Sequence, residues 1–134
     1  MKSEYAVAEF GRTHGLEGLS LQPLGHVRLG LPDGNWIALE EHADDVLVSM
    51  VTRVPHLTTE GMLLALQGCE ARNPGLDRAF QVGVQGSGAD AVLVLVTRLV
   101  ADRATASDIS AAVDACMRWL DRWNAEMSTT NGRA

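Results

Sequence analysis

The sequence predicts an α+β domain in which helices pack on an antiparallel sheet, in the order helix, three strands, helix, two strands, helix. Three observations predict it. Stretches 25–31 and 80–85 alternate apolar and polar residues as half-buried strands do. Short polar turns join neighbouring strands, which makes the strands antiparallel. A long apolar stripe with helical spacing lies near the end of the chain. The 134 residues suit one domain.

The first helix is predicted over residues 3–14, where Tyr5, Ala8 and Phe10 can share one side. Gly15 follows as a residue that adopts the left-handed conformation after a helix. The next segment is interrupted by glycine, serine and proline, so it is too broken for a helix. It is nevertheless too apolar for an ordinary loop. Its apolar residues are Leu16, Leu19 and Leu21.

The first three strands are predicted at 25–31, 36–40 and 46–52. In the first of them, valine and leucine alternate with His26 and Arg28, which is the period of a half-buried strand. Residues 32–35, PDGN, predict a turn, because proline presets φ and glycine accepts a positive φ. Residues 41–45, EHADD, are predicted as a polar connection.

A second helix is predicted over 59–72, although Gly61 and Gly68 each cost about 1 kcal/mol relative to alanine inside a helix. Its apolar residues recur at helical spacing: Met62, Leu63, Leu66 and Cys69. Asn73-Pro74-Gly75 is expected to end it. The last two strands are predicted at 80–85 and 91–99, joined by the turn GSGAD at 86–90.

The last helix has the clearest pattern. Thr105, with Asp108 three residues on, resembles a capping box. The stripe that follows, with spacings of three and four residues, consists of Ile109, Val113, Cys116, Leu120, Trp123 and Met127. This predicts a helix of about 20 residues. Residues 1–127 are therefore assigned to one domain, and residues 128–134 to a flexible tail.

Two of the predicted strands are apolar on both faces, whereas a sheet with one face in water should alternate. In 46–52, valine and methionine on one face oppose Leu47 and Val51 on the other. In 91–99, three valines oppose three leucines. Three helices are too few to cover both faces of this sheet. The second face then meets another subunit or a partner protein. The alternative is a single chain that covers both faces, or ordinary central strands.

Composition disfavours several classes of function. The net charge is −6 with 11 basic residues, which are scattered singly, and few aromatic residues are present for base stacking. Nucleic-acid binding is therefore not expected. No apolar stretch is long enough to span a membrane, and Glu4 and Glu9 interrupt the apolar run that a signal peptide needs. Cys69 and Cys116 are expected to be reduced core thiols in a cytosolic protein.

No motif of catalysis is present. The richest set of candidate metal ligands lies in one connection and is interpreted as a solvated acidic turn: Glu40, Glu41, His42, Asp44 and Asp45. Three histidines, His14, His26 and His56, have no positioned partner in the sequence that would make one a base. Cys69 as a nucleophile would need a nearby histidine. We therefore predict a protein that is not an enzyme and that uses no cofactor or metal.

The order of elements resembles that of the effector-specific chaperones of bacterial type III secretion, the CesT-like class I group. Three segments carry the resemblance. They are AVAEFGRTHGLEGLSL, the leucine-rich EGMLLALQG at 60–68, and AVLVLVTRL followed by a spacer and a long helix with RWLDRW. The resemblance covers about residues 4–127. It implies a homodimer in the bacterial cytoplasm that binds the N-terminal segment of a secreted effector in extended form, without nucleotide or metal.

The resemblance also implies two sets of site residues. The effector groove would be formed by Leu16, Leu19, Leu21, Val27, Leu29, Trp36, Val46 and Val48. The dimer interface would use Met62, Leu63, Leu66, Val92 and Val94. Two alternatives stay open. One is a small α+β ligand-binding domain or enzyme with a site near Glu40 and His42, and the other is a regulatory protein of the same fold.

Overall fold

The computed structural model describes residues 2–22, 24–43, 45–70, 78–100 and 104–131. Within them, three α-helices, five β-strands and one short 3-10 helix are formed, in the order predicted from the sequence. In chain order the elements are α1 (Lys2–Thr13), β1 (His26–Gly30), β2 (Trp36–His42), β3 (Asp45–Arg53), α2 (Thr59–Gly68), β4 (Gln81–Gln85), η1 (Gly88–Asp90), β5 (Val92–Leu99) and α3 (Ala106–Asn131). The α+β fold class is thereby confirmed.

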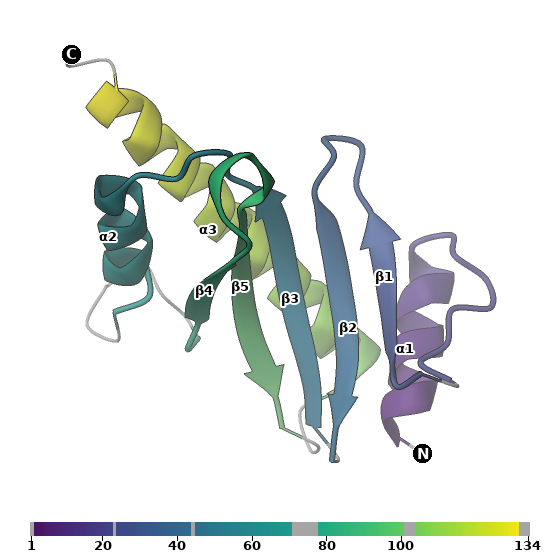
Figure 1. The fold of residues 1–134 in the computed structure, drawn as a ribbon. Coiled ribbons are helices and arrows are strands. Elements are labelled where there is room, and N and C mark those ends of the chain that lie inside the picture. The colour runs from purple at the N-terminus through teal and green to yellow at the C-terminus, as the bar shows by residue number, and fades with distance from the viewer. Residues whose placement is uncertain (1, 23, 44, 71–77, 101–103, 132–134) are drawn as a thin grey trace.

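The five strands form one antiparallel sheet in the order β1-β2-β3-β5-β4. Figure 1 shows α3 running behind the sheet, with α1 beside β1 at one end and α2 beyond β4 at the other. Both shorter helices contact α3. No described helix lies across the front of the sheet in this view. We call the side that faces α3 the inner face, and the opposite side the outer face.

The core lies between the inner face and the helices. The sheet contributes the buried side chains Ile37, Leu39, Val46, Val48, Met50, Leu93, Leu95 and Leu99. The predicted stripe of α3 packs against them, with Ile109 and Cys116 fully buried. Thr105 caps α3 as predicted, because its Oγ1 accepts from the Asp108 backbone N–H at 3.1 Å while Asp108 Oδ2 accepts from the Thr105 hydroxyl at 2.9 Å.

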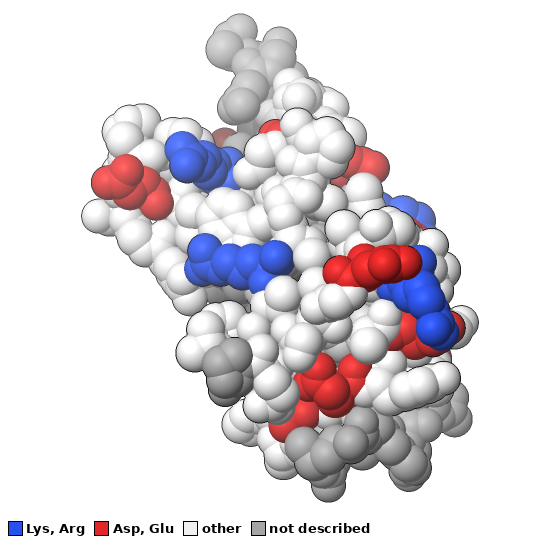
Figure 2. Space-filling model, turned by 90° about the vertical axis from the view of Figure 1, so that its right-hand side faces the viewer, with Lys and Arg blue, Asp and Glu red and all other residues white. Residues whose placement is uncertain are grey.

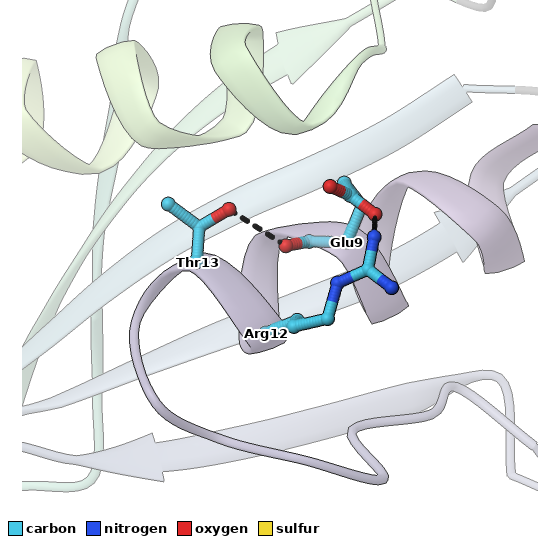
Figure 3. Close-up of polar contacts among 3 residues, drawn as sticks. All are labelled: Glu9, Arg12 and Thr13. Atoms are coloured by element: carbon cyan, nitrogen blue, oxygen red, sulfur yellow. Dashed lines mark hydrogen bonds and ion pairs between the residues drawn. The ribbon is translucent and has the colours of Figure 1, made fainter.

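The end of α1 fixes the segment that follows it. Leu16 N–H donates to the Gly11 carbonyl at 2.7 Å and Gly15 N–H donates to the Arg12 carbonyl at 3.2 Å, with Gly15 at φ 77° as predicted. This is a Schellman motif. A Cβ on Gly11 would lie 2.7 Å from the Leu19 Cβ, so glycine lets the chain fold back against the helix. Figure 3 shows two further contacts here, Thr13 Oγ1 to the Glu9 carbonyl and Arg12 to the Glu9 carboxylate.

The structure differs from the sequence prediction by more than one residue at three element ends. β2 continues to His42, because the register pairs Glu41 with Val46 and His42 with Asp45, so the predicted polar connection is mostly strand. The predicted second helix ends at Gly68, and the predicted break at 73–75 lies outside the described residues. Residues 128–131 of the predicted tail are helical, and 132–134 lie outside the description.

Candidate protein-binding site

The outer face of the sheet carries an apolar row that crosses all five strands. The registers align Gly30 with Trp36, Trp36 with Val51, Val51 with Val94, and Val94 with Gly83. Residues paired in this way project to the same face. We call these five residues the outer row. Trp36 and Val94 are half-buried, and Val51, in the middle, keeps 7% of its surface exposed.

Further apolar side chains flank the outer row, and we call the whole set the outer patch. It consists of Trp36, Ala38, Leu47, Val51, Val92, Val94 and Val96. None of them belongs to the core cluster or packs against it. Their partial burial comes from their neighbours in the sheet, since no described helix lies over them. An apolar surface of this kind on a folded domain marks an interaction site.

Three arginines stand around the outer patch, each on a different strand. Arg28 lies over the Trp36 ring, with its guanidinium carbon 5.3 Å from the ring centroid. Arg98 Nε lies 3.5 Å from Asp45 Oδ2. Arg53 pairs with Val92 at the other end of the face and makes no ion pair with another described residue. Positive charge thus gathers around this patch in a chain whose formal net charge is −6.

Charges of both signs are mixed on another side of the molecule. Figure 2 looks onto the side of the molecule that carries α1 and β1, and basic and acidic groups are interspersed there among uncharged ones. A nucleic-acid backbone would need a continuous basic surface. The side in view offers none.

A second apolar surface lies on α2. Leu63 and Leu66 project from it with 53% and 49% of their surface exposed. Beside them, Met62 and Val84 line an open hollow of about 540 Å³ between the start of α2 and the β4–β5 hairpin. Val84 pairs with Leu93, so this surface continues onto the inner side of β4 and not onto the outer face. We call these four residues the α2 surface.

Two tryptophans of α3 hold α2 in place. Trp119 Nε1 donates to the Gly68 carbonyl at 3.0 Å, and Trp123 Nε1 donates to the Gly61 carbonyl at 3.1 Å. Both glycines lie at tightly packed positions. A Cβ on Gly68 would lie 3.1 Å from Trp119 Nε1, and one on Gly61 would lie 2.9 Å from the Met127 Cε. The two glycines that weaken α2 as an isolated helix therefore dock it, with Leu63 and Leu66 turned outward.

The residues predicted for the effector groove fall into three groups. Leu21, Val46 and Val48 are fully buried at 0% exposure, so they are core residues with no surface for a partner in this structure. A second group lies partly buried against the core: Leu19 in the segment after α1, and Val27 and Leu29 on the inner side of β1. Leu16 is exposed in the segment after α1, and Trp36 stands on the outer face.

The residues predicted for the dimer interface separate into two surfaces. Met62, Leu63 and Leu66 lie together on α2. Val92 and Val94 lie on the outer face, in the same patch as Trp36. The sequence interpretation assigned Gly83 no role in a site. It also missed Val84 as surface. The alternation of side chains in 80–85 is the sequence signal that could have assigned Gly83 and Val84 to opposite faces of the strand.

The candidate metal ligands do not converge. Glu40 projects to the outer face, whereas Glu41, on the inner side, accepts a hydrogen bond from the Ser3 hydroxyl. Asp45 pairs with Arg98, and Asp44 lies outside the described residues. Across the described part of the chain, no group of three His, Cys, Asp or Glu side chains is placed to hold a metal ion.

Both thiols are held in the neutral form. Burial raises the pKa of Cys116 to about 12, partly offset by the charge of Arg78. Burial also raises the pKa of Cys69 to about 11, partly offset by a hydrogen bond with Trp119. Because the thiolate is the reactive form, neither cysteine is activated as a nucleophile at neutral pH.

The fold is similar to that of chaperones of type III secretion. A chain of the complex between SycH, a Yersinia pestis type III secretion chaperone, and a stable fragment of YscM2 matches with a TM-score of 0.65 and 11% identity, over 92% of this chain and 98% of that chain. The HopA1–SchA chaperone–effector complex matches with a TM-score of 0.68 and 14% identity, over 88% and 89% of the two chains.

Two other solved structures share the fold. The ExsC–ExsE complex matches with a TM-score of 0.63 and 20% identity, over 91% of this chain and 88% of that chain. YbjN from E. coli, for which a role in transcription regulation has been put forward, matches with a TM-score of 0.57 and 13% identity. At these identities the likeness establishes the fold. No protein-family profile and no curated protein sequence matches the chain. No helix in the described residues is long and apolar enough to cross a membrane.

Proposed function

We propose that this protein is a chaperone of type III secretion, which binds a segment of a secreted effector in extended form and keeps it competent for export. The outer patch is the observation that carries the proposal. It is an apolar sheet face that no described helix covers, in the fold of chaperones solved with their protein partners. The proposal places the protein in the bacterial cytoplasm and assigns it no catalysis and no cofactor.

The sheet offers two ways to hold an extended segment. β1 and β4 are its edges, so on one side each of them pairs with no other described strand. An added strand gains main-chain hydrogen bonds, and its alternate side chains reach pockets on one face. At the β1 edge, Leu19, Val27 and Leu29 stand partly buried beside the exposed Leu16. These four residues are the part of the predicted groove that a bound segment can reach on the inner side, and Trp36 is the part on the outer face.

The proposed protein is a homodimer, and we assign the interface to the α2 surface. Leu63 and Leu66 are about half exposed, which is costly for neighbouring leucines on one helix. The hollow beside Met62 and Val84 gives a second subunit a place for an apolar side chain. Val92 and Val94, for which the resemblance implied the same role, belong to the outer patch and are assigned to the partner protein instead.

The dimer is tested by light scattering after size-exclusion chromatography. The wild-type chain is expected to elute at twice its 14.4 kDa mass, and the double variant Leu63→Glu with Leu66→Glu at the monomer mass, with an unchanged circular dichroism spectrum. Leu24→Glu is the matched control, because Leu24 is an exposed leucine outside the α2 surface. A monomeric wild type over the whole accessible concentration range contradicts the assignment.

Chaperone activity is tested by co-expression with a secreted protein encoded beside the gene for this chain in its native host. We expect a stable complex, in which limited proteolysis leaves an N-terminal segment of the partner protected. Charge substitution at the outer patch, Val94→Asp, should abolish the complex and leave the dimer intact. A complex that survives this change, or the lack of any complex with secreted proteins of that host, counts against the proposal.

A further inference from the structure

The outer row contains a glycine that nothing in the described part of the chain explains. Gly83 lies in the middle of β4, and its φ is not in the left-handed region that requires glycine. A Cβ built on it would meet no atom within 4 Å. Glycine weakens a strand, because it has no side chain to pack and loses more backbone freedom on folding. An interior strand glycine without a local cause marks a place where another backbone comes close.

The opposite end of the outer row is also a glycine with no local cause. Gly30, on the other edge strand, also has an ordinary φ and open space where its Cβ would lie. The row thus begins and ends in glycine, with Trp36, Val51 and Val94 between. Four spacings of about 4.8 Å give it a length of about 19 Å, which about six residues of extended chain would cross.

The charges around the outer patch indicate what kind of segment fits. Three arginines, Arg28, Arg53 and Arg98, stand on this face against two carboxylates, Glu40 and Asp45. Asp45 already faces Arg98. Arg28 stacks on the Trp36 ring, and an arginine stacked in this way keeps its edge N–H donors available for a carboxylate. Three positive side chains against two negative ones leave this face an excess of positive charge, which favours acidic residues in a partner segment.

We infer that the outer row is the binding site of an extended, apolar partner segment that carries acidic residues, crosses the strands and passes with its backbone close over Gly83. The inference deepens the proposed function, on which it rests for the identity of the partner. Apolar side chains of the segment pack between Trp36 and Val94, and its carboxylates meet Arg28, beside the β1 end of the row, and Arg53, which flanks the middle of the row on its other side.

The probes are two synthetic peptides of about ten residues with the same alternating leucine and valine core. One carries a glutamate at one end of this core and another beside its middle, and the other peptide carries lysine at both positions. Fluorescence anisotropy with the purified dimer is expected to show that the acidic peptide binds about tenfold more tightly, and that added salt narrows the difference. Equal binding of the two peptides, or binding of neither, overturns the inference.

Two variants locate the site. Gly83→Val fits the free chain, since the space is open and φ is ordinary, and it is expected to weaken the acidic peptide about tenfold. Arg53→Gln should reduce the preference for the acidic peptide and leave the binding of the lysine peptide unchanged. Ala111→Val is the control, because it also creates a β-branched valine, with two added carbons where Gly83→Val adds three, at an exposed position of α3. Unchanged peptide binding by Gly83→Val contradicts the inference.

The same variants separate this inference from the proposed function and from self-association. If Gly83→Val converts the dimer to a monomer and leaves the peptide bound, a second copy of the chain occupies the outer row and the inference is wrong. If the acidic peptide binds as expected but no secreted protein forms a complex, the inference stands and the chaperone proposal falls. If a secreted protein binds equally well to wild type and Gly83→Val, the chaperone proposal stands and the inference falls.

Discussion

The two faces of the sheet are formed by the same strands but have different surroundings. Along β5, Leu93 and Leu95 project inward and keep 1% and 2% of their surface exposed, whereas Val94 and Val96 between them project outward and stay half-buried. Both sets are aliphatic, so hydrophobicity alone does not decide which is core. The difference lies in what stands opposite, since α3 covers one face and no described element covers the other. Apolar residues therefore serve stability on one side of a strand and recognition on the other.

The largest effect is expected from truncation on the inner face. Leu95→Ala removes a side chain that packs in the core cluster, so the free energy of unfolding should fall by about 2–5 kcal/mol. Urea denaturation followed by circular dichroism measures it. A loss below about 1 kcal/mol would show that the inner face is loosely packed and would remove the contrast between the faces.

The next largest loss of stability is expected from a substitution that weakens the contact between α2 and α3. Trp123→Phe keeps an aromatic ring but removes the N–H that donates to the Gly61 carbonyl at 3.1 Å. Leaving that carbonyl unsatisfied should cost about 1–3 kcal/mol. Relative to the wild type, amide hydrogen exchange in this variant should accelerate more in α2 than in the strands. Exchange that rises equally across the whole chain would mean that α2 is not docked as a separate unit.

The stability of the protein at alkaline pH tests whether the Cys116 thiol is shielded from water. Burial raises its pKa from an ordinary value of 9.0 to about 12. The unfolded chain therefore loses this proton first, so the contribution of the thiol to stability is present below about pH 9 and falls as the pH rises towards 12. We expect a loss of about 1 kcal/mol by about pH 10 that is absent in Cys116→Ala. The same pH dependence in both proteins would assign the loss to other groups.

The smallest effect on stability is expected on the outer face. Val96→Thr keeps the β-branched shape and lies outside the core cluster, so the free energy of unfolding should change by no more than about 0.5 kcal/mol. Thermal unfolding of this variant beside Leu95→Ala compares neighbouring residues of one strand. A loss for Val96→Thr as large as that for Leu95→Ala would place the outer face in a core and contradict its assignment as a binding surface.

Periodicity was sufficient to predict the order of elements and the two-sided apolar strands. The stripe from Ile109 to Met127 and the alternation of 25–31 each report one buried side, and that side is buried in the structure. Surfaces were harder to predict, because Val46 and Val94 look alike in sequence. Only the register places Val46 with Leu99 inside and Val94 with Val51 outside. The roles of Gly61 and Gly68 also depend on tryptophans more than fifty residues away, which no local pattern contains.

The strand order has a consequence for how the chain folds. β1, β2 and β3 are joined by short turns, and so are β4 and β5, so each group can pair locally. The β3–β5 ladder is the one long-range seam of the described sheet, and it joins Val51 to Val94. Long-range pairing is slow, because loop-closure entropy is lost before contacts are gained. We expect closure of this seam to limit the folding rate, and the outer row, which crosses the seam, to be complete only when that step is over.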